Sequence, residues 1–220
     1  MDIFNPIASS SSGNAYIYFD EILLDIGVPF SKIKSYIQKI KYILLTHQHS
    51  DHLNIGTLKK TIYENPKIRI CCGWFLVEEL LKNQIPSKNI FILQVDKSYQ
   101  IGDYVITPCM AVHDVPNFGY KLRYDKIGYK VFHISDTSEI NHIEAKEYNL
   151  YCIEANYGTD EELLEKIKQD EENGVYSHYK RVLKTHLSQL DAINWLNKNN
   201  TNGGEYYFIH QHIEKERNEK

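Results

Sequence analysis

A chain of 220 residues, 42% of them hydrophobic, can bury a full core, and its length favours a single domain over residues 1–220. The formal net charge of −4 argues against a protein that coats nucleic acid through bulk positive charge. No segment approaches the ~18 apolar residues of a membrane span, and the N-terminus lacks a signal-peptide pattern, so we expect a cytoplasmic protein without membrane contact. The four cysteines lack zinc-knuckle or redox spacing and are expected to be reduced core residues.

In chain order, the first half of the sequence alternates between strand and helix patterns. Short apolar runs bounded by turn residues predict strands, and apolar positions three and four residues apart predict helices. The segment 42–46 is apolar throughout, as expected for a strand buried inside a layered fold. The expected strands lie at 15–19, 21–27, 42–46, 67–72 and 90–95, and the expected helices lie at 31–40, with Ser31 as cap, at 56–64 and at 74–84.

The second half of the sequence begins with consecutive strand patterns and returns to helices near its end. Groups of strands with helices before and between them predict sheets that pack together and are covered by helices. The sequence therefore favours an α/β layered fold. The strands expected here lie at 104–113, 119–125, 128–136, 150–156 and 206–210, and the helices lie at 160–172 and 188–199.

A dense group of metal-binding residue types follows the apolar strand at 42–46. The string THQHSDH contains His47, His49, Asp51 and His52. Zinc and similar ions favour imidazole nitrogen and carboxylate oxygen, and a strand end would hold such ligands rigidly. His47 and His49 can aim at one ion, and Asp51 and His52 at a second ion ~4 Å away. The alternative, a solvated histidine-rich turn, explains a single histidine better than this whole string.

This HxHxDH string resembles that of the metallo-β-lactamase superfamily, and the resemblance spans nearly the whole chain. It implies a four-layer αββα sandwich of two mixed sheets with a dinuclear site at one edge. By this resemblance, Asp25 is a carboxylate that steadies the histidine loop, His113 is the third histidine of the first site, and Asp136 bridges both metals. The implied cofactors are two divalent ions, with zinc expected and manganese or iron as alternatives.

Within the superfamily the chain most resembles the YycJ/WalJ type, which is similar to RNase Z without its long arm. The segments SSSSGN, HD…GY, IEAN and HLS carry this likeness. The serine run ending at Gly13-Asn14 predicts a turn, which the resemblance places at the rim of the site with Ser12 and Asn14. Glu154 of IEAN is expected to orient a histidine. The chain departs from the type at Thr185, where that type has glycine.

Two further histidines are assigned by the same resemblance. His186 stands before a predicted helix and is expected to contact phosphate or to donate a proton, although a polar residue at a helix start is the alternative. His210 follows the strand at 206–210 and is our choice for the last ligand of the second site, with His212 as its rival. The histidines outside the motifs, His133, His142 and His178, are expected to be ordinary structural or surface residues. The aromatic residues Phe118 and Tyr120 are expected to pack in the core, with base stacking as an alternative.

The resemblance implies a metal-dependent phosphodiesterase or nuclease that hydrolyses nucleic acid at single strands or ends, like an exonuclease. Asp51 would orient the attacking water and His186 would protonate the leaving oxygen. The alternatives are a cyclic-nucleotide phosphodiesterase of the type that phages use for immune evasion, a small-molecule lactonase or β-lactamase-like hydrolase, and a non-catalytic nucleotide-binding protein. The sequence does not decide among these substrates, and a homodimer is consistent with the family.

Overall fold

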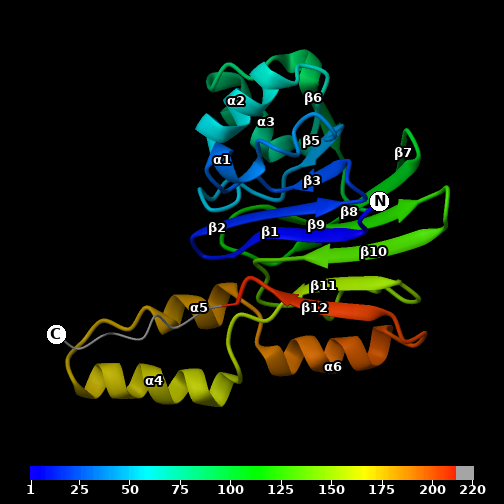
Figure 1. Cartoon of the computed structure of the whole chain (residues 1–220). Helices are drawn as coiled ribbons and strands as arrows, with labels where there is room; N and C mark the ends of the chain where they lie inside the picture. The colour runs from blue at the N-terminus through cyan, green and yellow to red at the C-terminus, as the bar shows by residue number, and fades with distance from the viewer. Residues whose placement is uncertain (212–220) are drawn as a thin grey trace.

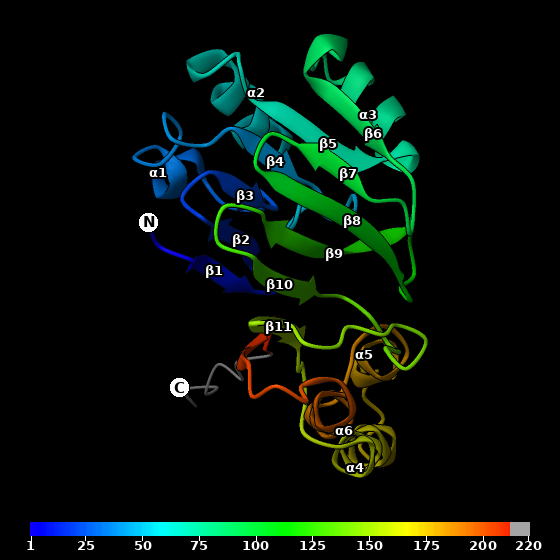
Figure 2. The same ribbon diagram turned by 90° about the vertical axis from the view of Figure 1, so that its right-hand side faces the viewer.

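The computed structural model describes residues 1–211. These residues form two β-sheets that pack face to face, with helices on both outer faces (Figure 1). The arrangement in layers is helix, sheet, sheet, helix, and Figure 2 shows the same layers from the side. The predicted fold class, an α/β sandwich of two mixed sheets, is therefore confirmed. None of the helices in residues 1–211 has the length and apolar character needed to cross a membrane.

The N-terminal sheet follows the order of the chain. Its first three strands pair antiparallel, and the others continue the sheet in parallel. Its strands are β1 (Phe4–Ser10), β2 (Gly13–Tyr18), β3 (Ile22–Leu24), β4 (Tyr42–Leu44), β5 (Arg69–Gly73) and β6 (Ile90–Leu93). The β1 strand was not predicted, because it contains Pro6 and polar serines. It lies at the sheet edge, where proline does not remove a required hydrogen bond.

The strands of the C-terminal sheet also lie in chain order, but in the opposite direction across the sandwich. Its first four strands form an antiparallel meander, and the last two pair in parallel beyond β10. Its strands are β7 (Tyr99–Ile101), β8 (Tyr104–Ala111), β9 (Asn117–Tyr124), β10 (Tyr129–Ile134), β11 (Leu150–Glu154) and β12 (Glu205–Ile209). All the predicted strands of this half are present with shifted ends, whereas β7 was not predicted.

The helices divide between the two outer faces. The first group covers the N-terminal sheet: α1 (Phe30–Ile33), α2 (Ile55–Glu64), η1 (Trp74–Leu76), α3 (Val77–Lys82) and η2 (Ser87–Asn89). The second group lies on the side of the C-terminal sheet: α4 (Asp160–Glu172), α5 (Tyr179–Thr185) and α6 (Gln189–Asn199). The α6 helix begins after Ser188, which caps it because its side chain accepts a hydrogen bond from Asp191 N.

Two helix predictions differ from the structure. The helix predicted at 31–40 ends at Ile33, and the cap position belongs to Pro29 rather than Ser31. Tight turns follow it and bring Ile37 and Ile40 into the core, which the apolar spacing alone does not distinguish from a helix. The α5 helix was not predicted. His186 lies at the C-terminal end of α5 and also precedes the Ser188 cap of α6, as the sequence indicated.

The core lies in three apolar layers, one between the sheets and one beneath each set of helices. Aromatic and aliphatic side chains from both sheets fill the central layer, among them Tyr16, Leu24, Leu44, Ile106, Tyr120 and Val131. Burial of these side chains removes apolar surface from water, which stabilises the fold by roughly 25 cal/mol per Å² of apolar surface buried. The same side chains fix how the two sheets pack together. The four cysteines are buried and free, as predicted.

Candidate metal centre

The histidine and aspartate side chains of the predicted site come together at one edge of the sandwich. They follow the ends of β3, β4, β8, β10 and β12, so both sheets hold them. Asp25, Asp136 and His210 have φ values of 58°, 52° and 51°, in the left-handed region. Aspartate and histidine tolerate this conformation better than most residues, and a chain that turns sharply at a strand end directs the side chain back into the site.

The loop that carries the histidine string packs against the segment after β3. Ile26 N donates to His52 O, and Asn14 N donates to Asp51 O. Gly27 lies so close to this loop that a Cβ atom there would be 1.7 Å from Asp51 O. Only glycine allows this approach, so the LLDIG segment sets the position of the loop as well as supplying a carboxylate.

The first group of ligand atoms consists of three imidazoles and Asp136. His47 Nε2 lies 3.0 Å from His49 Nδ1, which lies 3.3 Å from His113 Nε2. Asp136 Oδ2 lies 3.3 Å from His47 Nε2 and 3.6 Å from His113 Nε2. All four ligand atoms lie within 4.8 Å of one another, close enough to share one metal ion.

The second group uses the other side of the same carboxylate. His52 Nε2 lies 3.3 Å from Asp136 Oδ2 and 3.5 Å from Asp51 Oδ2. His210 Nε2 lies 3.3 Å from Asp136 Oδ1. The ligand atoms of these four residues also lie within 4.8 Å of one another. Asp136 is common to both groups, so the arrangement has the form of two cation positions joined by one carboxylate.

In each imidazole of the cluster, the ring nitrogen that faces away from the cluster contacts a neighbouring group. These contacts set the orientation and tautomer of the ring, which leaves the inner nitrogen available to a cation. The pairs are His47 Nδ1 with Thr46 Oγ1 at 3.0 Å, His49 Nε2 with Asp114 Oδ1 at 3.4 Å, His52 Nδ1 with Asp25 Oδ2 at 2.6 Å, His113 Nδ1 with Thr185 O at 3.0 Å and His210 Nδ1 with Asn14 Oδ1 at 3.3 Å.

The electrostatics of the cluster favour a bound cation. Burial lowers the pKa of His113 to about 4 and that of His210 to about 3, so both imidazoles are neutral and can act as ligands at pH 7. Burial alone would raise the pKa of Asp136, but the neighbouring His52 holds it well below its usual value, so it stays ionised. Within residues 1–211 the carboxylates of Asp25 and Asp136 have no lysine or arginine partner.

The donor set fits divalent metal ions. Asp136 Oδ1 is buried and makes no hydrogen bond to any atom of residues 1–211, although an ionised carboxylate oxygen rarely stays unpaired. When the outer nitrogen of each imidazole carries the proton, the inner nitrogens have no proton to donate. The inner nitrogens that lie 3.0 to 3.3 Å apart therefore cannot hydrogen-bond to one another. Imidazole and carboxylate ligands in this number suit zinc and similar ions. A shared cation satisfies both observations.

Glu154 and His186 form a third group beside the cluster. His186 Nδ1 lies 2.6 Å from Glu154 Oε1, and Glu154 Oε2 accepts a hydrogen bond from Thr137 N. Burial raises the pKa of Glu154 to about 7. Burial would lower the pKa of His186, but the Glu154 carboxylate raises it overall. His186 can therefore carry a proton next to the two cation positions.

The structure also shows contacts that the sequence did not indicate. Asp114 lies 3.2 Å from His113 Nε2 and receives a hydrogen bond of 2.8 Å from Arg181, which lies on the unpredicted α5 helix. The phrase HD after β8 contained Asp114, but no local pattern assigns it a role. His178, placed among the histidines without a motif, lines the cavity of the site. That cavity has a volume of about 290 Å³.

Several predicted positions differ in detail. Asn14 is a residue of β2 rather than of a turn, and its side chain contacts both His52 and His210. Ser12 is exposed and bonds to Ser10, whereas its neighbour Ser11 lines the cavity. His212 lies outside the described residues.

The aromatic candidates for base stacking are buried away from the cavity. Phe118 and Tyr120 belong to the core between the sheets, and the hydroxyl group of Tyr120 donates to Leu45 O. The stacking interpretation for these two residues is therefore wrong, and the packing interpretation is confirmed. His133 is likewise structural, because it is fully buried and contacts the hydroxyl group of Tyr18.

The Beta-lactamase superfamily domain matches residues 20–211, so the chain belongs to this superfamily. The YycJ exodeoxyribonuclease of Bacillus anthracis is 32% identical over 126 residues, which cover 50% of this chain and 46% of that protein. The WalJ exodeoxyribonuclease of Streptococcus pneumoniae is 27% identical over 179 residues, covering 71% and 63%. These matches confirm the resemblance to the YycJ/WalJ type.

Solved structures show the same fold. The short form of human tRNase Z superimposes with a TM-score of 0.67 over 94% of this chain and 92% of that chain, at 15% sequence identity. The chain spans about half to two thirds of the length of the curated relatives named above. The fold is thus shared with the human tRNase Z structure over most of this chain.

Proposed function

We propose that this protein is a dinuclear metal-dependent phosphodiester hydrolase that acts on nucleic acid, at single strands or strand ends. The observation that carries this proposal is the pair of ligand groups that share Asp136. His47, His49 and His113 would hold the first ion, and Asp51, His52 and His210 the second. Zinc is the expected metal because imidazole nitrogens dominate both groups.

When bound, such ions activate water for attack on phosphorus and stabilise the negative charge that develops on the phosphoryl oxygens. The residues of this chain supply the rest of the chemistry. Asp51 faces both the cavity and the cluster, so its carboxylate can orient the attacking water. His186 lines the same cavity and, protonated beside Glu154, can donate a proton to the leaving oxygen.

The names of the relatives support a nucleic-acid substrate. Both curated relatives are called exodeoxyribonucleases. The cavity also carries a cationic group suited to phosphate, because Arg181 lines it together with the cluster. Arg181 is well exposed, so it can exchange its ion pair with Asp114 for a substrate phosphate.

An activity panel tests the proposal. The purified protein is loaded with zinc or manganese and assayed against bis-p-nitrophenyl phosphate, single-stranded DNA, RNA, cyclic nucleotides and a lactone. We expect hydrolysis of the phosphodiester and of single strands, and no activity after chelation. Preferred turnover of cyclic nucleotides or of the lactone would replace the nuclease proposal with that activity. Tight nucleotide binding without any turnover would show a binding protein instead.

A further inference from the structure

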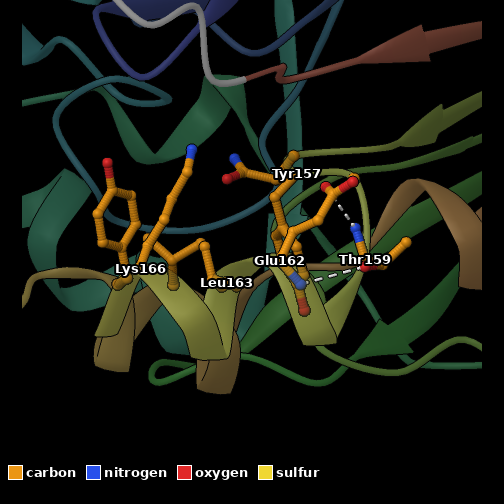
Figure 3. Close-up of a pocket in the computed structure, with 9 residues that line it drawn as sticks. Tyr157, Thr159, Glu162, Leu163 and Lys166 are labelled. Carbon is orange, nitrogen blue, oxygen red and sulfur yellow. Dashed lines mark hydrogen bonds between the residues drawn. The ribbon is translucent and has the colours of Figure 1, made fainter. Parts of the chain in front are cut away.

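A second cavity, which we call the α4–α5 pocket, lies beside the metal centre and has a volume of about 330 Å³ (Figure 3). The residues after β11 form one wall, and the helices α4 and α5 form the others. Figure 3 shows Lys166 at one end of the pocket and Tyr157 and Thr159 at the other. A cavity of this size falls in the ~300–1,000 Å³ range of small-molecule sites.

The α5 helix separates this pocket from the cavity of the metal centre. Val182 lines both cavities, whereas Tyr179 faces the pocket and Arg181 faces the metal centre. The wall after β11 is also tied to the cluster, because the Asn156 side chain donates to His210 O at 3.0 Å. A ligand anchored at the metal centre therefore needs to pass only one short helix to enter the pocket.

The lining of the pocket combines apolar, aromatic and polar groups. Leu163 and Val182 provide apolar surface between the two helices. The ammonium group of Lys166 lies 5.4 Å from the centre of the Tyr179 ring. At the other end, Glu162 and Thr159 bond to each other through a capping box, which holds that wall in place. A planar, polar-edged group suits this combination, because aromatic and cationic side chains stack on its face while polar groups meet its edge.

We propose that the α4–α5 pocket binds one nucleobase of the substrate whose phosphodiester group lies at the metal centre. This inference rests on the proposed function and deepens it, because it names the substrate class as a nucleotide unit with an accessible base. A base in a duplex is paired and stacked, so only a single strand, a strand end or a mononucleotide ester can place its base there. The pocket thus selects against intact duplex DNA.

Two variants on different helices test the subsite. Tyr179→Leu removes the aromatic ring, and Lys166→Met removes the ammonium group but keeps a long side chain. The matched controls are Tyr176→Leu, whose tyrosine is 83% exposed and does not line the pocket, and Lys168→Met, which lies on the solvent side of α4. Using variants from two helices ensures that a local folding defect in one does not decide the result.

The substrates are the 5′- and 3′-p-nitrophenyl phosphate esters of thymidine, which place the base on either side of the phosphate, and methyl p-nitrophenyl phosphate, which has no base. We expect both pocket variants to lose roughly tenfold in kcat/KM on at least one thymidine ester, the order of magnitude of one lost base stack. Their activity on the methyl ester, and all activities of the controls, should stay within about twofold of wild type.

The outcomes separate the subsite from the proposed function. Unchanged ratios of thymidine-ester to methyl-ester activity in both pocket variants would overturn the subsite and leave the phosphodiesterase proposal standing. An equal loss on all three esters would also overturn it, because it would indicate a general effect on the metal centre. Turnover of none of the esters by wild-type, metal-loaded protein would overturn the proposed function and the subsite with it.

Discussion

Replacing Asp25 by asparagine changes the metal centre through a single hydrogen bond. Asp25 Oδ2 lies 2.6 Å from His52 Nδ1, and Thr46 N donates to Asp25 Oδ1 at 2.9 Å. In the Asp25→Asn variant, the side-chain amide keeps an acceptor for Thr46 only if its NH₂ group faces His52. That NH₂ group needs an acceptor, so His52 Nδ1 must lose its proton. The proton then moves to His52 Nε2. This nitrogen faces the cluster and is the atom expected to bind the metal, so the proton competes with the metal for it.

The size of this effect follows from the burial of the pair. Both side chains are completely buried, so water cannot compensate a mispaired donor, which costs about 1–3 kcal/mol. Loss of a partner that orients a metal-binding histidine typically lowers metal affinity by about 10–100-fold. Because the proton would occupy the ligand nitrogen itself, we expect Asp25→Asn to fall at the upper end of that range, at about 100-fold.

Zinc affinity is measured by competition with a chromogenic chelator, alongside thermal unfolding of the metal-free protein. Asp125→Asn is the matched control, since Asp125 is exposed on the turn between β9 and β10 and bonds to Arg123. We expect weaker zinc binding only in the Asp25 variant. Zinc affinity equal to that of wild type, in a variant that folds normally, would refute the assignment of His52 Nε2 as a ligand atom.

Three other features of the structure can be tested separately. Asp114→Asn should lower zinc affinity by only about tenfold, because its contact with His49 is longer and its side chain is 34% exposed; a loss as large as that of the Asp25 variant would contradict this ranking. Gly27→Ala should destabilise the protein by more than about 2 kcal/mol in denaturant unfolding, because its Cβ would overlap Asp51 O. The matched control is Gly56→Ala, whose Cβ meets no atom closer than 3.4 Å, so the stability of this variant should be unchanged or raised. Burial raises the pKa of every cysteine thiol to about 12, so the thiols stay protonated at about pH 8 and should react with a thiol reagent only after unfolding; rapid labelling of the folded protein would show that a thiol is accessible.

The sequence predicted most of the layered fold because its strands are short apolar runs and its longer helices have clear spacing. The segment 42–46 is apolar because both faces of β4 are covered, one by helices and one by the other sheet. The elements it missed lack such a pattern. The β1 strand is interrupted by Pro6, ends in two serines and lies at an edge, and α5 has one buried residue, Thr185, so neither shows a periodic apolar face.

In the candidate site, too, the sequence indicated the residues of a local motif and missed those that only the fold brings together. The string from His47 to His52 is local and chemically distinctive, so spacing and residue type were enough to single it out. The ion pair of Asp114 and Arg181 joins positions 67 residues apart, and only the folded chain brings them together. The α4–α5 pocket likewise depends on two helices and a loop that meet in space, which no single segment of the sequence indicates.

The most direct test of the central claim is a titration of activity against bound metal. Metal-free protein receives zinc in steps, bound zinc is determined by elemental analysis, and hydrolysis of bis-p-nitrophenyl phosphate is measured at each step, for wild type and for Asp136→Ala. The shared carboxylate predicts that wild type binds two zinc ions with activity rising as the second one binds, and that Asp136→Ala lacks both the second ion and the activity. Full activity at one bound zinc ion, or an active Asp136→Ala variant, would contradict the dinuclear centre.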